Sequence, residues 1–289
     1  MLCYHIDVPR MLLNEIPAAE ALLRDGYTVM PSFLQAGDLQ VLTQEVEVSS
    51  PDVEAMCRPG LFPLRWNDTI VASILRSERH VRSLCAALGA GDLRWLSGYI
   101  SMRAPHSPAL WWHRDWWCWD HPISFRRSAT QVAVLCYLSD TDTRSGALRV
   151  LPGSHHAGTA VHCLLPEAHG ELADRLPPDH AAMADLPGQT TLNLQAGDAV
   201  VLDYRLLHGT HANETRRRRD CVLLSFIPAW CDLPMEMRAH LIMHHALPGE
   251  AEAKSRSTSG YGERLPRFDG PPASLRLNRV PPAWFTVSD

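Results

Sequence analysis

The spacing of apolar residues changes near residue 92, and this change constrains the fold more than any other feature of the chain. Before that point, apolar side chains recur every three to four positions in segments 17–24, 38–48 and 69–88, a spacing typical of helices with one buried face. A short aromatic and β-branched run at 27–30 predicts an edge strand. Residues 1–92 are therefore expected to form a mainly helical support region.

After residue 92 the chain carries the pattern of seven short strands. Turns such as Ser145-Gly146 and Ala196-Gly197-Asp198 separate them, and close spacing of this kind is typical of sandwiches and barrels. Hydrophobic residues make up 46% of the chain, enough for a sizeable core. We therefore expect a mainly β protein with flanking helices. The predicted strands lie at 93–103, 110–115, 130–138, 147–151, 190–194, 199–204 and 221–227.

No internal repeat or linker divides the chain, so one domain spanning residues 1–289 is expected. Residues 93–228 hold the predicted β core. Segment 155–188 interrupts that core with a long Pro- and His-containing stretch, weakly helical around 167–176, and we expect such an insertion to form a lid or rim. Residues 229–289 are expected to wrap the surface, because their end is rich in Pro, Gly, Ser and Arg.

Charge and cysteine content exclude several classes of function. A net charge of −5 and a pI of about 6.3 predict no nucleic-acid partner. The eight cysteines are scattered without a C-x-x-C pair, which indicates reduced thiols and neither a disulfide framework nor a zinc cage. Because the sequence shows neither a signal peptide nor an apolar run of membrane-spanning length, we expect a soluble, cytoplasmic protein with no membrane partner. Oligomeric state leaves no mark in the sequence.

The densest chemical signal is Leu-Trp-Trp-His-Arg-Asp-Trp-Trp-Cys-Trp-Asp at 110–120. On an extended strand His113 and Asp115 would point to the same face, because residues two apart alternate to one side. An imidazole and a carboxylate are two of the three ligands of a facial metal site, and a second histidine must come from a distant strand that faces them. His208, where the predicted strand at 199–204 ends, is suitably placed among 15 histidines.

A run of four arginines at 216–219 enters the last predicted strand. An arginine on an apolar strand would bury its guanidinium, and a buried charge is costly unless an anion lies beside it. A dicarboxylate cosubstrate would supply that anion with two-pronged geometry. The alternative without a function is a solvent-exposed basic cluster. The residues alone leave open which of the four arginines is buried.

Taken in order, these segments resemble the phytanoyl-CoA dioxygenase family of Fe(II)- and 2-oxoglutarate-dependent oxygenases. The strongest part is Gly-Ala-Leu-Arg-Val-Leu-Pro-Gly-Ser-His at 146–155, which lies between the H-x-D pair and Asp-Tyr-Arg-Leu-Leu-His at 203–208. The opening Leu-Arg-Asp-Gly-Tyr-Thr-Val-Met-Pro at 23–31 is also similar. The resemblance covers roughly residues 20–228.

The resemblance implies a fold, a metal and a cosubstrate. The implied fold is a double-stranded β-helix, jelly-roll or cupin-like, with a helical N-terminal region. Arg219 matches the arginine that family members use to hold the distal carboxylate of 2-oxoglutarate, because it follows His208 by eleven residues. The implied roles are Fe(II) ligation by His113, Asp115 and His208, and 2-oxoglutarate binding by Arg219 together with Thr130 or Gln131.

The implied activity consumes O2 and 2-oxoglutarate, releases succinate and CO2, and hydroxylates an unactivated C–H bond of a small molecule. We expect an amino-acid-like acid or a natural-product intermediate as substrate. Asp115 favours this outcome over halogenation, because related halogenases lack that carboxylate. Desaturation, epimerisation or cyclisation with the same cofactors is the alternative. A non-catalytic metal- or ligand-binding barrel and a hydrolytic zinc site are less favoured.

Five tryptophans surround the H-x-D pair and bear on the substrate. By strand alternation Trp111 and Trp117 would share the face of His113, whereas Trp112 and Trp116 would face into the core. An indole wall suits an apolar, ring-containing or cationic substrate, although packing alone would also account for these residues. The predicted substrate contacts are Trp111, Trp117, Arg103 and His211.

Overall fold

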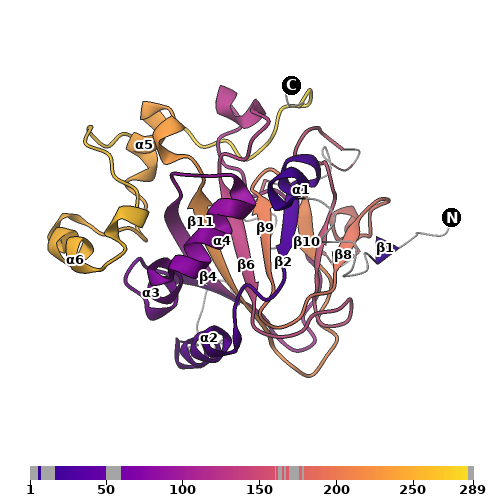
Figure 1. Cartoon of the computed structure of the whole chain (residues 1–289). Coiled ribbons are helices and arrows are strands. Elements are labelled where there is room, and N and C mark those ends of the chain that lie inside the picture. Colours follow the sequence, from indigo (N-terminus) through magenta and orange to yellow (C-terminus); the bar gives the residue numbers. More distant parts are fainter. Residues whose placement is uncertain are drawn as a thin grey trace.

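The structure is a computed structural model that describes residues 6–7, 17–49, 60–159, 161, 165, 167–168, 176–177 and 179–285. Its strands form two sheets (Figure 1). The larger is antiparallel throughout, in the order β2 (Tyr27–Met30), β9 (Ala199–Asp203), β6 (Val132–Tyr137), β11 (Arg219–Ile227), β4 (Arg94–Arg103) and β3 (Leu61–Leu64).

The smaller sheet carries most of the candidate site. Its order is β1 (Ile6–Asp7), β8 (Thr190–Leu192), β7 (Leu148–Val150), β10 (His208–Thr210) and β5 (Leu110–His113). Only β1 pairs in the parallel sense, with β8. Neighbouring strands in both sheets are mostly far apart in the sequence, which is the crossing topology expected for a double-stranded β-helix.

The N-terminal helices lie over one face of the larger sheet, whereas the C-terminal helices lie to one side of it (Figure 1). The N-terminal helices are α1 (Ala18–Asp25), α2 (Ala36–Ser49), α3 (Thr69–Arg76) and α4 (Glu78–Leu88). The C-terminal ones are α5 (Met235–Leu241) and α6 (Ala253–Thr258). Single 3-10 turns occur at η3 (Pro122–Phe125), η6 (Ala181–Met183), η7 (Trp230–Asp232), η8 (Glu250–Glu252) and η9 (Gly262–Arg264).

Segment 69–88 was predicted to be one helix, and this prediction is wrong because the segment contains two. Ser77 separates α3 from α4 with an extended backbone, at φ −79° and ψ 108°. Its hydroxyl accepts a hydrogen bond from the backbone N–H of His80, which makes Ser77 the N-cap of α4. The helical spacing of apolar residues continues from α3 into α4, so the sequence pattern gave no sign of the N-cap between them. Gly89 ends α4 in the left-handed conformation, as its position predicted.

Residues 61–64 were expected to belong to a loop, whereas they form β3 at the edge of the larger sheet. Pro63 concealed this strand, since proline is tolerated in a sheet mainly on edge strands. Along β3 the side chains of Phe62 and Leu64 are buried while Leu61 is exposed. The predicted edge strand at 27–30 is confirmed as β2, which occupies the opposite edge.

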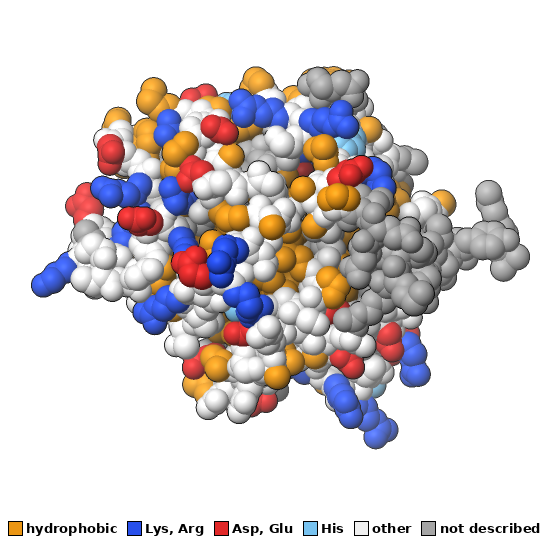
Figure 2. Space-filling view, in the orientation of Figure 1, with side chains coloured by type: hydrophobic (Ala, Val, Ile, Leu, Met, Phe, Trp, Pro, Cys, Tyr) orange, Lys and Arg blue, Asp and Glu red, His pale blue; other side chains and the backbone are white. Residues whose placement is uncertain are grey.

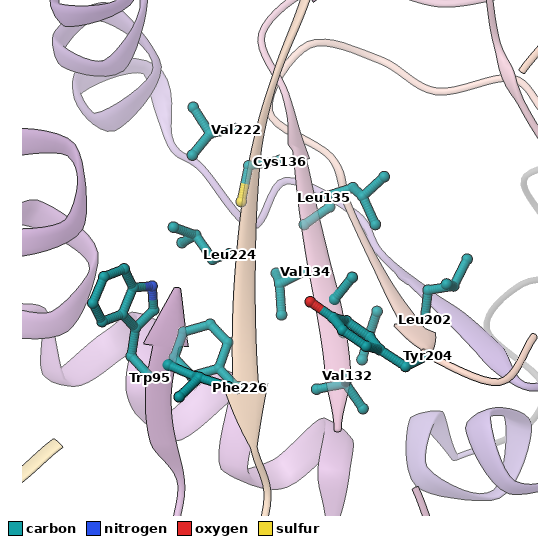
Figure 3. Packing of buried hydrophobic residues seen from close by; sticks show 14 of the residues in the cluster. Trp95, Val132, Val134, Leu135, Cys136, Leu202, Tyr204, Val222, Leu224 and Phe226 are labelled. Carbon is teal, nitrogen blue, oxygen red and sulfur yellow. The ribbon is translucent and has the colours of Figure 1, made fainter. Parts of the chain in front are cut away.

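The larger sheet has an outer face that packs against the helices and an inner face that lines the barrel. Figure 3 shows the outer set from β11 beside Trp95 of β4, all of them buried: Val222, Leu224 and Phe226. The alternate residues of β11 lie on the inner face, and the register places Arg219 opposite Arg103 and Leu223 opposite Tyr99. Polar groups on this inner face are therefore enclosed between the two sheets.

The C-terminal residues run back over the barrel mouth. The indole N–H of Trp230 donates to the carbonyl of Arg267 at 2.8 Å. Asn278 forms an isolated parallel β-bridge with Cys118 in the Trp-rich segment. The predicted weak helix at 167–176 lies outside the described residues except at 167, 168 and 176. On the face shown in Figure 2, side chains of both charges are interspersed among apolar ones. None of the helices in the described ranges is both long and apolar enough to cross a membrane.

Candidate metal centre and substrate cavity

The two histidines of the candidate metal centre lie on neighbouring strands. His208 is the first residue of β10 and pairs directly with His113, the last residue of β5. Their ring centroids are 4.3 Å apart. The sequence interpretation placed His208 at the end of the strand at 199–204, which is distant in the sequence and was expected to face His113. The chain instead turns after β9 and starts a new strand, so the two rings come together as a cross-strand pair.

Backbone carbonyls orient both imidazole rings. Nδ1 of His113 lies 2.9 Å from the carbonyl oxygen of Trp111, and Nδ1 of His208 lies 3.0 Å from that of Leu206. A carbonyl accepts only, so each Nδ1 is the protonated donor and each Nε2 keeps its lone pair. Both Nε2 atoms face Asp115, with separations of 3.7 Å for His113 and 3.6 Å for His208.

Asp115 reaches the histidines by a route that strand alternation does not provide. β5 ends at His113, so Asp115 lies beyond the strand. The backbone N–H groups of Asp115 and Trp116 both donate to the carbonyl of Tyr204 at 2.9 Å. This tie to the end of β9 turns the carboxylate back towards the rings, and one carboxylate oxygen lies near each Nε2.

The donor set fits a divalent metal ion of the iron type. One atom each from His113, Asp115 and His208 lies within 4.8 Å of the others, close enough to surround a single ion. Two imidazoles and one carboxylate on one side of an ion form the facial triad of non-haem Fe(II) oxygenases. In the part of the chain that the structure describes, no other trio of His, Cys, Asp or Glu groups comes this close.

Only one of the four consecutive arginines is buried. Arg216 and Arg217 are exposed, and Arg218 forms a two-pronged pair with Asp220, at 2.7 Å for the shortest contact. Arg219 is 3% exposed and lies over the ring of Tyr137 at 5.5 Å. The structure therefore selects Arg219 as the arginine on the inner face, which the sequence alone left open.

Several buried polar atoms on strands of the two sheets lack hydrogen-bond partners among the described residues. They are Nε of Arg219, the hydroxyl of Tyr137 and the hydroxyl of Thr210. Leaving such groups unpaired is costly, and together they are donors that suit an anion. Thr210 was missed by the sequence reasoning. Its position two residues after His208 on β10, on the same side of the strand, could have indicated it.

Arg103 lies beside Arg219 and does not line the substrate cavity. The two residues are opposite one another in the β4–β11 ladder. Burial, and then the charge of Arg219, lowers the pKa of Arg103 to about 10, so the side chain of Arg103 remains cationic at neutral pH. Arg219 is buried, whereas Arg103 is partly buried and donates to the carbonyl of Pro108. Two neighbouring guanidinium groups of this kind favour an anion beside them. Their position agrees with a carboxylate-binding end of the barrel.

A cavity of about 460 Å³ opens on the other side of Asp115. Its walls come from the inner face of the larger sheet, from α5 and from the C-terminal segment. The residues that matter below are Trp117, Gln131, Tyr204, His240, His244 and Arg279.

Trp117 and Gln131 form one hydrogen-bonded unit in the cavity wall. The indole N–H of Trp117 donates to Oε1 of Gln131 at 2.8 Å, and Nε2 of Gln131 donates to the hydroxyl of Ser225 at 2.7 Å. The predicted substrate contact Trp117 and the predicted cosubstrate contact Gln131 thus lie together at the cavity. Thr130 lies outside β6 and does not line this cavity.

Two further predicted substrate contacts lie away from this cavity. The ring of Trp111 is 5.7 Å from that of His113, but the cavity walls do not include it. His211 is hydrogen-bonded through Nε2 to the hydroxyl of Thr191 at 2.8 Å. Trp112 and Trp116 are both buried, as predicted, although only Trp112 lies on the strand whose alternation was the reason given.

The C-terminal part of the cavity was missed by the sequence reasoning. His240 belongs to α5, a helix that was not predicted, and Arg279 belongs to the C-terminal segment, in which no single residue was predicted to contact a ligand. Burial lowers the pKa of His240, and burial with the nearby His245 and His240 lowers that of His244 to about 4. No local spacing signals these residues, because tertiary packing alone brings them to the site.

Known proteins resemble this chain in sequence and in fold. The chain is 28% identical to the L-proline trans-4-hydroxylase of Streptomyces griseoviridis over 221 residues, 70% of this chain and 81% of the relative. HygX from Streptomyces hygroscopicus, solved with nickel, 2-oxoglutarate and hygromycin B, superposes with a TM-score of 0.55 at 21% identity, covering 76% of this chain and 88% of that one. The epimerase SnoN, solved with Fe3+, alpha-ketoglutarate and nogalamycin RO, gives 0.52 at 21% identity, covering 77% and 86%.

The two solved structures confirm the predicted fold class, a jelly-roll core with flanking helices. The sequence profile of the family described as phytanoyl-CoA dioxygenase matches residues 22–221, which is more than half of the chain. The expected enzyme class, a 2-oxoglutarate-dependent dioxygenase, agrees with that match. The chain therefore belongs to the phytanoyl-CoA dioxygenase family.

Proposed function

We propose that this protein is an Fe(II)- and 2-oxoglutarate-dependent oxygenase that hydroxylates an unactivated C–H bond of a small molecule. The observation that carries the proposal is the triad of His113, Asp115 and His208, in which both imidazole Nε2 atoms face the Asp115 carboxylate. Its barrel also holds a buried Arg219 that no acidic side chain in the described part of the chain neutralises.

The triad residues would hold the iron from one side. Because the chain supplies three ligands, the remaining positions are left for a bidentate 2-oxo acid and for dioxygen. When bound, iron and 2-oxoglutarate together supply oxidation of a substrate C–H bond, coupled to decarboxylation of the oxo acid to succinate and CO2. The carbonyls of Trp111 and Leu206 keep the two rings in the orientation that this role needs.

The inner-face donors would bind the distal carboxylate of 2-oxoglutarate. The guanidinium of Arg219 can donate two parallel hydrogen bonds to one carboxylate. The hydroxyls of Thr210 and Tyr137 are buried donors without protein partners in the described ranges. Burial raises the pKa of Tyr137, which keeps its phenol protonated and able to donate. Arg103 adds a second positive charge in the neighbouring ladder position.

The cavity beside Asp115 would hold the substrate. Its volume of about 460 Å³ suits a small molecule, and Trp117, hydrogen-bonded to Gln131, supplies an aromatic part of its wall. One relative is named as a hydroxylase of the amino acid L-proline. The fold neighbour HygX was solved with the natural product hygromycin B. An amino-acid-like acid or a natural-product intermediate is the substrate class that we propose.

Desaturation, epimerisation or cyclisation could follow from the same residues, since the fold neighbour SnoN is an epimerase. Product mass separates these outcomes. Hydroxylation adds one oxygen, desaturation or ring closure removes two hydrogens, and epimerisation leaves the mass unchanged.

The experiment that tests the proposal is a screen of small molecules for those that accelerate succinate formation from 2-oxoglutarate, with product mass read in the same assay. We expect succinate formation to need Fe(II) and to be lost in His208→Ala, while His106→Ala, a change of an exposed histidine, leaves it intact. Succinate formation that survives in His208→Ala would contradict the proposal. An active zinc-loaded protein with an inactive iron-loaded one would also contradict it.

A further inference from the structure

The C-terminal segment places a single arginine beside the candidate metal centre. Arg279 lines the main cavity together with Asp115. It also lines a narrow adjoining space together with His113, Val280 and Pro281. Arg279 therefore shares a cavity wall with each of two triad residues, although it lies far from them in the sequence.

The backbone on either side of Arg279 is tied to the segment that carries Asp115. The N–H of Asn278 donates to the carbonyl of Trp117 at 2.9 Å, and the N–H of Trp119 donates to the carbonyl of Asn278 at 3.0 Å. The side chain of Asn278 donates to Asp120 at 2.6 Å and accepts from the N–H of Val280 at 2.9 Å. These hydrogen bonds fix the backbone on either side of Arg279 at the cavity wall, within an otherwise Pro-rich segment.

Arg279 supplies the one permanent positive charge in the described wall of the main cavity. Asp115 is the one acidic residue in that wall, and the triad role uses it. His240 and His244 are neutral at pH 7, because burial lowers the pKa of each, that of His244 to about 4. No hydrogen bond or ion pair joins Arg279 to any residue in the described ranges.

A guanidinium next to a bound divalent cation is unfavourable unless an anion lies near both. Arginine binds carboxylates in a two-pronged manner that fixes their orientation. The rest of the cavity wall is mainly leucine and aromatic side chains, with Ser97, Tyr99 and Gln131 as uncharged polar groups. The complementary ligand has one carboxylate on a compact, largely apolar or ring-containing body.

We infer that Arg279 binds the carboxylate of the substrate, so that the substrate is a small carboxylic acid oxidised at a carbon near that group. This inference rests on the proposed function and narrows it, because it names the recognised group and the residue that selects it. Arg279 acts here as a specificity-determining residue. The same chemistry would reject the neutral amide of an otherwise identical compound.

The test measures binding of paired probes to the anaerobic Fe(II)–2-oxoglutarate complex through perturbation of its visible charge-transfer band. The probes are L-proline, L-pipecolic acid, cyclohexanecarboxylic acid and phenylacetic acid, each beside its primary amide. The variants are Arg279→Gln, Arg279→Lys and the matched control Arg276→Gln, in which an exposed arginine three residues away changes.

We expect at least one acid to perturb the band, with its amide roughly tenfold weaker or more. Arg279→Gln should weaken that acid by roughly tenfold or more and leave the amide unchanged, while Arg279→Lys restores part of the affinity. Arg276→Gln should behave as the wild type. The affinity for 2-oxoglutarate should stay the same in all variants, because Arg219 serves that ligand.

Four outcomes would overturn the inference: amides that bind as well as acids, no acid that perturbs the band, an acid affinity unchanged in Arg279→Gln, or a loss of 2-oxoglutarate affinity in that variant. The last would assign Arg279 to the cosubstrate. Failure of the proposed function is distinguishable, because the band itself would then never form in the wild type. If the band forms without acid selectivity, only the role of Arg279 fails.

Discussion

A histidine can ligate a metal only through a ring nitrogen that carries no proton, and in this protein backbone carbonyls decide which nitrogen that is. The carbonyls of Trp111 and Leu206 hold the protonated Nδ1 atoms of His113 and His208. Elsewhere on the inner face, Nε of Arg219 and the hydroxyl of Tyr137 have no hydrogen-bond partner among the described residues. At the residue scale, orientation and missing partners together define where the ion and the oxo acid would bind.

Arg219→Gln is predicted to raise the KM for 2-oxoglutarate by roughly a hundredfold, because truncating one partner of a buried charge pair costs about 2–5 kcal/mol. The matched control is Arg217→Gln, since Arg217 is exposed in the same run. Steady-state succinate formation as a function of 2-oxoglutarate concentration gives both values. Equal KM values for the two variants would show that Arg219 does not bind the cosubstrate.

Gln131→Leu is predicted to lower the free energy of unfolding by about 1–3 kcal/mol, because it leaves the buried indole N–H of Trp117 without its acceptor. The hydroxyl of Ser225 loses a partner in the same change. Urea unfolding of Gln131→Leu, Trp117→Phe and the double variant measures the coupling between the two side chains. Strictly additive effects would mean that the hydrogen bond does not contribute to stability.

At the element scale, the close pairing of β5 with β10 creates the metal centre. Gly209 makes this pairing possible, because a Cβ at that position would lie 2.8 Å from the carbonyl oxygen of Leu110 and 3.0 Å from that of Trp111. Contacts this short with backbone atoms force one strand to move. His208 and His113 can meet only while the strands stay this near.

Gly209→Ala is therefore predicted to weaken Fe(II) binding by roughly tenfold or more, since the added methyl group separates the two histidine strands. Gly37→Ala is the matched control, because no atom lies within 4 Å of a Cβ there and the position is helical. Fe(II) affinity from metal competition compares the two. An unchanged affinity in Gly209→Ala would mean that the strand spacing does not set the ligand geometry.

The sequence predicted the elements well wherever the period of apolar residues was unambiguous. Each strand expected after residue 92 exists, with no end shifted by more than two residues. The errors have local physical causes. Ser77 caps a second helix inside a continuous apolar stripe, Pro63 disguises an edge strand, and a turn after β9 gives His208 a strand of its own.

At the scale of the whole molecule, the C-terminal segment reaches the site through contacts that no local sequence pattern predicts. The triad and Arg219 were predictable because a family motif with fixed spacing carries them, and the family itself is confirmed. Arg279 and His240 were not, because packing of the C-terminal segment alone places them. The orientation of Asp115 likewise depends on the carbonyl of Tyr204, which is remote in sequence.

The same long-range packing buries His155 against the N-terminal region, and this predicts a pH dependence of stability. Burial, with the nearby charges of His156 and Arg205, lowers the pKa of His155 to about 4, against an opposing effect of Asp203. The unfolded chain takes up this proton first as the pH falls below about 6.5. Stability is therefore complete above pH 6.5, declines towards pH 4 and then levels, by up to about 3 kcal/mol in total.

Urea unfolding at a series of pH values between 7 and 4 measures this decline. His155→Phe should flatten it, because the ring that must be protonated is gone, whereas His106→Ala, an exposed position, should leave the slope as in the wild type. A slope unchanged in His155→Phe would assign the pH dependence to other groups.

The central claim, that this triad binds iron so that 2-oxoglutarate can chelate it, is tested most directly by an anaerobic titration. Fe(II) and 2-oxoglutarate are added to the purified protein, and the visible charge-transfer band of the chelate is recorded for the wild type and for His208→Ala. The account predicts that the band forms in the wild type and is absent in the variant. A wild type that shows no band, or a band that persists in His208→Ala, would contradict it.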